Sequence, residues 1–355
     1  MKKFLLLLVV VSATLALIGC SQKPKLYVLN WGDYMDPELI LAFEKEYGVS
    51  VSYKPAGSNE EMATLLQAST TTYDIVIPSD YMIDKLVKED MLQPINFELL
   101  TNFESLDVID RLYDLYAATN IAPYVVPYAW GTIGILYNTT NPILKALIEQ
   151  QGWAALFEFG STYKVGMYDS ARDAVAAALL YKGFHVNSSD QSELDQAEQA
   201  LKDANFNAWG EDNLKGLVIS GNLDMALVYS GDYFSEYYVA LEDGIAINFD
   251  FYVPESTNVW MDAMVIPKNA QNVELAHKFI NFFLREDIAI ANSDYIGYAP
   301  CYTSVYDALI SEEYGYDFET FNPYPAGSVR QMYVYGTDDR QSKIIAILNR
   351  AKAAR

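Results

Sequence analysis

The chain has 355 residues, with 47 acidic and 24 basic side chains and a formal net charge of −23. A surface this acidic repels nucleic acid and raises the local concentration of cationic partners. The length is too great for one hydrophobic core and suits two domains.

The N-terminus reads as an export signal. Two basic residues, Lys2 and Lys3, precede an apolar run that ends in Leu17-Ile18-Gly19-Cys20. This pattern predicts a secretory signal peptide over residues 1–19, too short to span a membrane. Residues 17–20 resemble a bacterial lipobox, so we expect a lipidated Cys20, a tether over residues 20–25 and a lipid anchor. An ordinary signal peptide with an incidental cysteine is the alternative.

Cleavage before Cys20 removes two lysines and no acids, so the charge of the mature chain changes from −23 to −25. With Cys20 lipidated, Cys301 is the only free cysteine, and no intramolecular disulfide can form.

The first part of the mature chain alternates strands and helices. Asp36 is placed to cap a helix that has Pro37 at its first position and that Gly48 ends. We expect strands at 26–29, 49–53 and 73–78 and helices at 37–47, 60–69 and 82–89. This order predicts a parallel sheet flanked by helices, and ligands of such sheets bind at the carboxyl ends of the strands.

A second α/β unit begins near Gly131. We expect strands at 132–137, 164–168, 223–229 and 245–253, and helices at 141–152, 174–182, 194–204, 273–284 and 342–355.

The segment Val259–Pro267 reads as a strand because it is apolar, rich in β-branched residues and closed by a proline. Side chains two apart share a face of a strand, so Trp260 and Asp262 point the same way. An indole face attracts a cation, and a carboxylate supplies the opposite charge. A core tryptophan beside a surface aspartate is the alternative.

The combination of rings and acids recurs after several predicted strands, which favours an aromatic box with acidic corners. Such a box suits a flexible chain with ammonium groups, because rings cover methylenes and carboxylates pair with charged ends. The clusters are Trp31 with Asp33 and Tyr34, Asp80 with Tyr81, Tyr229 with Asp232 and Tyr233, and Trp260 with Asp262, and Tyr298 lies in a further loop.

Four motifs carry a resemblance to a known family: YVLNWGDY at 27–34, YDIVIPSDY at 73–81, WMD at 260–262 and IGY at 296–298. In order and spacing they resemble the periplasmic spermidine/putrescine-binding proteins of ABC transporters. The resemblance implies an α/β, two-lobed periplasmic binding protein fold of type II. Each lobe is a mixed sheet flanked by helices, two crossovers join the lobes, and the ligand lies in the cleft. It implies a first lobe of residues 26–129 and 261–300 and a second of 130–260 and 301–355.

The resemblance also implies roles for single residues. Trp31, Tyr229 and Trp260 match aromatic residues of the cleft, with Tyr229 where the family usually has tryptophan. Asp262 matches the main carboxylate that pairs with ammonium, and Asp173 stands where the family usually has glutamate. Ser79, Tyr81, Tyr298 and Gln331 match other ligand contacts.

Two features favour a short diamine. Ser170 stands where spermidine-binding members have aspartate, and Asp33 and Asp232 match acids of putrescine-specific members. We therefore expect Asp262 and Asp173 toward one end of the ligand and Asp33 and Asp232 toward the other. For Asp173 the alternative is a charge pair with Arg172 at the start of a helix.

The competing class is an enzyme, because paired carboxylates among aromatic rings also describe a glycosidase cleft. No metal-ligand spacing or nucleophile motif supports catalysis, and the two histidines, His185 and His277, lie outside the clusters and are expected on the surface. A sugar or ferric iron in the same fold stays an alternative.

The sequence thus predicts a non-enzymatic, monomeric, lipid-anchored binding protein, exported to the periplasmic or extracytoplasmic face. We expect it to deliver a polyamine, putrescine before spermidine, to a membrane ABC permease. No cofactor, metal or nucleic acid is expected.

Overall fold

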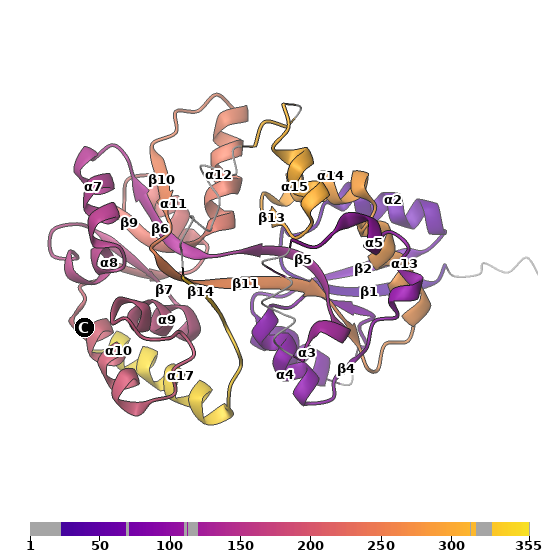
Figure 1. The fold of residues 1–355 in the computed structure, drawn as a ribbon, viewed down its shortest axis with the longest axis horizontal. Helices are drawn as coiled ribbons and strands as arrows, with labels where there is room; N and C mark the ends of the chain where they lie inside the picture. The colour runs from indigo at the N-terminus through magenta and orange to yellow at the C-terminus, as the bar shows by residue number, and fades with distance from the viewer. Residues whose placement is uncertain are drawn as a thin grey trace, which may run out of the picture.

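The computed structural model describes residues 23–68, 71–109, 112, 120–312, 314–316 and 329–354. The predicted signal peptide, Cys20 and the first residues of the tether lie outside these ranges. Figure 1 shows two lobes, with strands β5 and β11 running between them. This arrangement agrees with the two-lobed α/β fold that the sequence predicts.

The first lobe is built on a sheet of order β2-β1-β3. Its strands are parallel, as the β-α-β-α-β pattern predicts. A bridge between Val76 and Val265 joins this sheet to the pair β12-β4. The elements are β1 (Lys25–Asn30), α2 (Pro37–Tyr47), β2 (Ser50–Pro55), α3 (Asn59–Gln67), β3 (Ile75–Val76), α4 (Asp80–Lys88), β4 (Leu92–Gln93), η1 (Phe97–Leu99), α5 (Phe103–Leu106), η2 (Ala122–Tyr124), β12 (Ile266–Pro267), α13 (Val273–Phe283), α14 (Glu286–Ile296), β13 (Ala299–Pro300) and α15 (Thr303–Leu309).

Local signals fix the first helix as expected. The Asp36 side chain accepts a hydrogen bond from the backbone N–H of Glu38, Pro37 occupies the first turn, and Gly48 ends α2 with a φ of 67°. The left-handed conformation at Gly48 is one that glycine adopts without steric cost. This turn leads the chain into β2, which pairs in parallel with β1.

The second lobe contains a five-stranded sheet of order β10-β6-β9-β7-β8. Helix α9 is almost wholly buried against this sheet, and α10 and α17 pack on α9. The elements are β6 (Ile133–Asn138), α7 (Pro142–Gln151), α8 (Ala154–Glu158), β7 (Val165–Tyr168), α9 (Ala171–Tyr181), α10 (Gln191–Asp203), β8 (Ala208–Gly210), α11 (Asn213–Ile219), β9 (Met225–Tyr229), α12 (Ser230–Glu242), β10 (Phe249–Tyr252), β14 (Val329–Met332) and α17 (Asp338–Ala353).

Two long strands connect the lobes. Strand β5 (Val126–Gly131) pairs antiparallel with β11 (Ser256–Met264), and β14 lies parallel to the first half of β11. The register between β11 and β5 shifts between Asp262 and Ala263. Asp262 also forms an isolated β-bridge with Ser79, which follows β3. The strand that the sequence places at 259–267 therefore begins three residues earlier and carries the Trp260–Asp262 pair through the middle of the molecule.

The division at residues 129/130, 260/261 and 300/301 stays a prediction. Helix α15 lies in a segment, 301–355, that the prediction gives to the second lobe. It packs against α14 and α5, which belong to the first lobe.

One histidine differs from expectation. His277 is buried, and its ring bridges the backbone N–H of Asn96 and the carbonyl of Val273. His185 is exposed as predicted. The amphipathic pattern of α13 does not distinguish a buried imidazole with two partners from a solvated one.

Candidate functional site: an acidic and aromatic cleft

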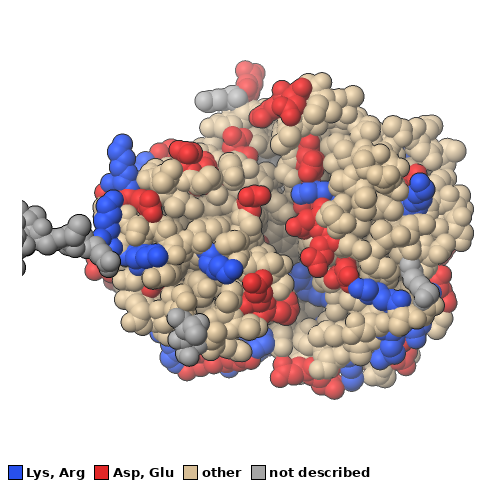
Figure 2. Space-filling view, turned by 180° about the vertical axis from the view of Figure 1, so that it is seen from behind, with Lys and Arg blue, Asp and Glu red and all other residues tan. Residues whose placement is uncertain are grey.

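A furrow separates the lobes on one face of the molecule, and acidic side chains gather along its rims (Figure 2). The carboxyl ends of β3 and β9 meet the middle of β11, because Ser79, beyond β3, bridges Asp262, and the Tyr229 ring, at the end of β9, contacts Trp260. The loop after β1 joins them through Tyr34, whose ring contacts Tyr298. Most of the residues that the sequence singles out follow these strand ends.

Asp262 lies on β11 and is only 6% exposed. Burial raises the pKa of its carboxyl group to about 6, although the hydroxyl groups of Ser79 and Tyr34 and the charge of Arg172 lower it. Its Oδ1 atom is buried and has no hydrogen-bond partner among the described residues. A buried carboxylate oxygen without a donor is unstable unless a cation or a donor reaches it, so Asp262 is suited to receive one.

Aromatic rings surround this carboxylate and meet edge to face. Ring centroids lie 5.2 Å apart for Tyr34 and Tyr298, 5.7 Å for Tyr298 and Trp260, and 5.8 Å for Trp260 and Tyr229. Gly131 makes room for the indole, because a Cβ atom there would lie 2.6 Å from Trp260 Cζ2. The rings come from both lobes and form a continuous wall.

Asp232 lies in the first turn of α12 and is buried. Its Oδ1 accepts a hydrogen bond from Lys215 Nζ at 3.0 Å, and its Oδ2 is buried without a partner among the described residues. Burial raises its pKa to about 6, and Lys215 opposes the rise. Burial and the negative charges of Asp232, Asp212 and Asp262 raise the pKa of Tyr298.

Asp173 has a different surrounding. Its Oδ1 accepts from Arg172 Nε at 3.3 Å and from Tyr333 at 3.5 Å, and its Oδ2 accepts from Arg172 Nη2 at 3.3 Å and from Tyr229 at 2.8 Å. The side chain is 1% exposed. The charge pair at the start of α9, stated above as the alternative, is present here, buried among tyrosines.

The start of α4 supplies three of the predicted residues. Asn59 accepts from the backbone N–H of Ser79 and donates to its hydroxyl, which fixes the Ser79 side chain. Tyr81 donates to Glu60 at 3.1 Å. Asp80 accepts from the backbone N–H groups of Tyr81 and Met261, so it ties α4 to β11, and burial raises its pKa to about 8.

Three predicted residues are not brought fully into this cluster. Asp33 is exposed in the loop after β1, and Trp31 is half-buried beside it. Gln331 uses both ends of its amide, accepting from the backbone N–H of Val186 and donating to Ser256. Gln331 is therefore, like Asp173 and Asp80, a proposed ligand contact whose side chain already has hydrogen-bond partners within the protein.

Four residues were missed as parts of this site. Tyr333 lies two positions beyond Gln331, and the alternation of a strand was a signal for it. Arg172 was noted only as a partner of Asp173. Lys215 is 17 residues from Asp232, and Gly231 contacts Tyr298; no local pattern marks either contact.

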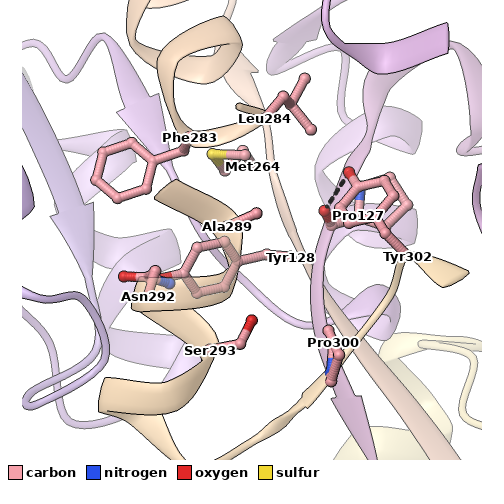
Figure 3. Close-up of a pocket in the computed structure, with 10 residues that line it drawn as sticks. All are labelled: Pro127, Tyr128, Met264, Phe283, Leu284, Ala289, Asn292, Ser293, Pro300 and Tyr302. Atoms are coloured by element: carbon pink, nitrogen blue, oxygen red, sulfur yellow. Dashed lines mark hydrogen bonds between the residues drawn. The ribbon is translucent and has the colours of Figure 1, made fainter. Parts of the chain in front are cut away.

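A separate small pocket lies within the first lobe (Figure 3). Tyr128 links the two places, because its hydroxyl donates to the Tyr34 carbonyl at 2.6 Å and accepts from Asn292 at 2.8 Å. The pocket has no carboxylate. It is lined by Pro127, Tyr128, Met264, Phe283, Leu284, Ala289, Asn292, Ser293, Pro300 and Tyr302.

The described residues contain no cluster of histidine, cysteine, aspartate and glutamate that could hold a metal ion. Within the same residues no helix is long and apolar enough to cross a membrane.

Comparison with known proteins gives consistent matches. The sequence model for the bacterial extracellular solute-binding protein family matches residues 38–318. The chain is 35% identical over 281 residues to a spermidine/putrescine-binding periplasmic protein of Salmonella typhimurium, covering 78% of each chain. It is 29% identical over 328 residues to a putrescine-binding periplasmic protein of Pseudomonas aeruginosa, covering 88% of each.

Among solved structures, a putative spermidine/putrescine ABC transporter protein from Listeria monocytogenes superposes with a TM-score of 0.79 at 32% identity. The match covers 93% of this chain and 99% of that one. It confirms the fold predicted from the sequence, the two-lobed type II periplasmic binding protein fold. The family and these relatives are solute-binding components of transport systems rather than enzymes.

Proposed function

Because this chain belongs to the bacterial extracellular solute-binding protein family, and is similar to its spermidine/putrescine-binding members, we propose that it captures a polyamine and delivers it to the permease of an ABC transporter. The ligand lies between the lobes. Closure of the lobes removes water and strengthens each charge pair.

The observation that carries this proposal is the buried, unpartnered Oδ1 of Asp262 within a wall of aromatic rings. An ammonium group supplies both the positive charge and the hydrogen-bond donors that this atom lacks. The faces of Trp260 and Tyr298 favour the same cation and cover the methylenes that follow it. A neutral sugar would leave the carboxylate without a counter-charge.

Putrescine is the polyamine that this arrangement favours. Two buried carboxylate oxygens have no partner among the described residues of the cleft, Asp262 Oδ1 and Asp232 Oδ2. Putrescine carries two ammonium groups, one for each oxygen, and spermidine carries three. Ser170, which caps α9 through its hydroxyl, offers a third ammonium no charge. We therefore rank putrescine above spermidine.

The site of action follows from the N-terminus. The signal peptide over residues 1–19 directs export, and lipidation of Cys20 anchors the chain at the extracytoplasmic face. The short tether leaves both lobes free in the aqueous space, where a monomer meets the permease.

Calorimetric titration of the purified mature chain tests the function. The panel contains putrescine, cadaverine, spermidine, spermine, a basic amino acid, a monosaccharide and ferric citrate. The account predicts binding of polyamines, with putrescine tightest. Binding of the monosaccharide or of iron in place of every polyamine would contradict it, whereas tighter spermidine binding would overturn only the ranking.

A further inference from the structure

Arg172 places a positive charge inside the cleft. It is the second residue of α9, and its side chain is 20% exposed. The guanidinium carbon lies 4.3 Å from the ring centroid of Tyr81, in the first lobe, and 5.1 Å from that of Tyr333. A cation of the protein therefore lies between rings from α4 and from the segment after β14.

The contacts of this guanidinium are those expected of a bound ammonium group. It faces two aromatic rings, pairs with Asp173 through Nε and Nη2, and donates from Nη2 to the Tyr229 hydroxyl at 2.9 Å. Its positive charge also acts on the carboxyl groups of Asp80 and Asp262, where it opposes the rise in pKa that burial causes.

Asp173 consequently has no free acceptor for a ligand. Each of its two oxygens accepts one hydrogen bond from Arg172 and one from a tyrosine, Tyr333 at Oδ1 and Tyr229 at Oδ2. Asp262 and Asp232, by contrast, each have one buried oxygen without a partner among the described residues. The cleft thus holds four buried acids. Protein groups satisfy Asp80 and Asp173, whereas Asp262 and Asp232 each keep one oxygen for a ligand.

We infer that Arg172 is a specificity-determining residue that occupies the third cationic position of the cleft and so restricts the ligand to two ammonium groups. A third ammonium near Asp173 would meet a like charge and no unused acceptor, and like charges in a partly buried site repel strongly. The inference rests on the proposed polyamine binding and adds Arg172 to the side chains that favour a diamine.

Two neutral variants and one charged variant test this role. Arg172→Gln and Arg172→Met remove the charge, and Arg172→Lys keeps it without the planar fork. Each variant and the wild type are titrated with putrescine and spermidine, and thermal melting shows whether each is folded. In both neutral variants we expect the spermidine-to-putrescine affinity ratio to rise at least about tenfold, since a like charge is lost and Asp173 is released. In Arg172→Lys we expect the ratio of the wild type.

Three results would overturn the inference while leaving polyamine binding intact. They are an unchanged ratio in the neutral variants, an equal loss of affinity for both ligands, and unfolding of both neutral variants while Arg172→Lys folds. Each would make Arg172 a structural link between the lobes. A wild type that binds neither polyamine would instead refute the proposed function, and the wild-type titration alone reveals it.

Discussion

Gly231, at the start of α12, lies directly against the ring of Tyr298, where the two lobes meet. A Cβ atom at Gly231 would lie 2.1 Å from Tyr298 Cε1 and 2.3 Å from Cδ1 and Cζ. The optimal separation between two non-bonded carbon atoms is about 3.5–4.0 Å. The Tyr298 ring cannot easily move away, because the rings of Tyr34 and Trp260 pack against it with centroid separations of 5.2 and 5.7 Å. Gly231→Ala therefore places a methyl group where the two lobes meet.

The expected cost falls on binding rather than on folding. Alanine is favoured over glycine inside a helix by about 1 kcal/mol, so the second lobe itself is not destabilised. Forcing a methyl group into a packed contact costs about 1–3 kcal/mol. If the contact forms when the lobes close on the ligand, putrescine affinity falls about 5- to 150-fold.

Calorimetry with putrescine measures the effect, and thermal melting checks the fold. Gly216→Ala is the matched control, because Gly216 lies in α11 of the same lobe and a Cβ atom there meets nothing within 4 Å. We expect this control to bind as the wild type does. Wild-type affinity in a folded Gly231→Ala variant would show that binding does not require this contact between the lobes.

Three further predictions follow from the site and the N-terminus. Asp232→Ser removes one unpartnered carboxylate, so the preference for putrescine over spermidine should narrow or reverse in competition titrations; an unchanged ratio would exclude Asp232 from the site. Because burial raises the pKa values of Asp262 and Asp232 to about 6, lowering the pH from 7 to 5 should weaken putrescine binding by about tenfold in total for each carboxylate that pairs with the ligand. The ligand-free protein should show the opposite trend and melt at a higher temperature as the pH falls from 8 to 5. Burial raises the pKa values of Asp80, Asp232 and Asp262 in the folded state above 3.8. The folded state therefore binds more protons than the unfolded state in this range, and stability is lost as the pH rises through the folded-state pKa values. A putrescine affinity and a melting temperature that do not change over this pH range would contradict the two expectations. Cys20→Ser should abolish lipid labelling and release the protein from membranes, and retention of the variant together with an unlabelled wild type would contradict the anchor.

Much of the fold could be predicted because its signals are local. The Asp36 cap, Pro37 and Gly48 bound α2 within the sequence that forms it. The strand expected at 73–78 is reduced to Ile75–Val76, since Asp74 accepts hydrogen bonds from the backbone N–H groups of Tyr27, Gln271 and Asn272. Those partners are distant in sequence, and no local pattern shows them.

The candidate site divides in the same way. Period-two alternation places Trp260 and Asp262 together on β11, and both are buried in the cleft. The protein donors that occupy these acids could not be predicted, because they come from distant elements. Lys215 donates to Asp232 from α11. Tyr229 and Tyr333, which lie at the ends of two different strands, donate to Asp173 beside Arg172. Exposure of Asp33 likewise depends on how its loop packs, which the Trp31-Gly32-Asp33-Tyr34 motif does not specify.

The central claim is that Asp262 pairs with a ligand ammonium, and titration of Asp262→Asn with putrescine tests it most directly. The substitution keeps the shape of the side chain and removes its charge, and breaking a buried pair from one side costs about 3–5 kcal/mol. Asp243→Asn, at the exposed end of α12, is the control for loss of one negative charge. The account predicts that Asp262→Asn binds putrescine more than about a hundredfold more weakly than the wild type and that Asp243→Asn binds normally. Wild-type affinity in Asp262→Asn would contradict the claim and place the ligand elsewhere.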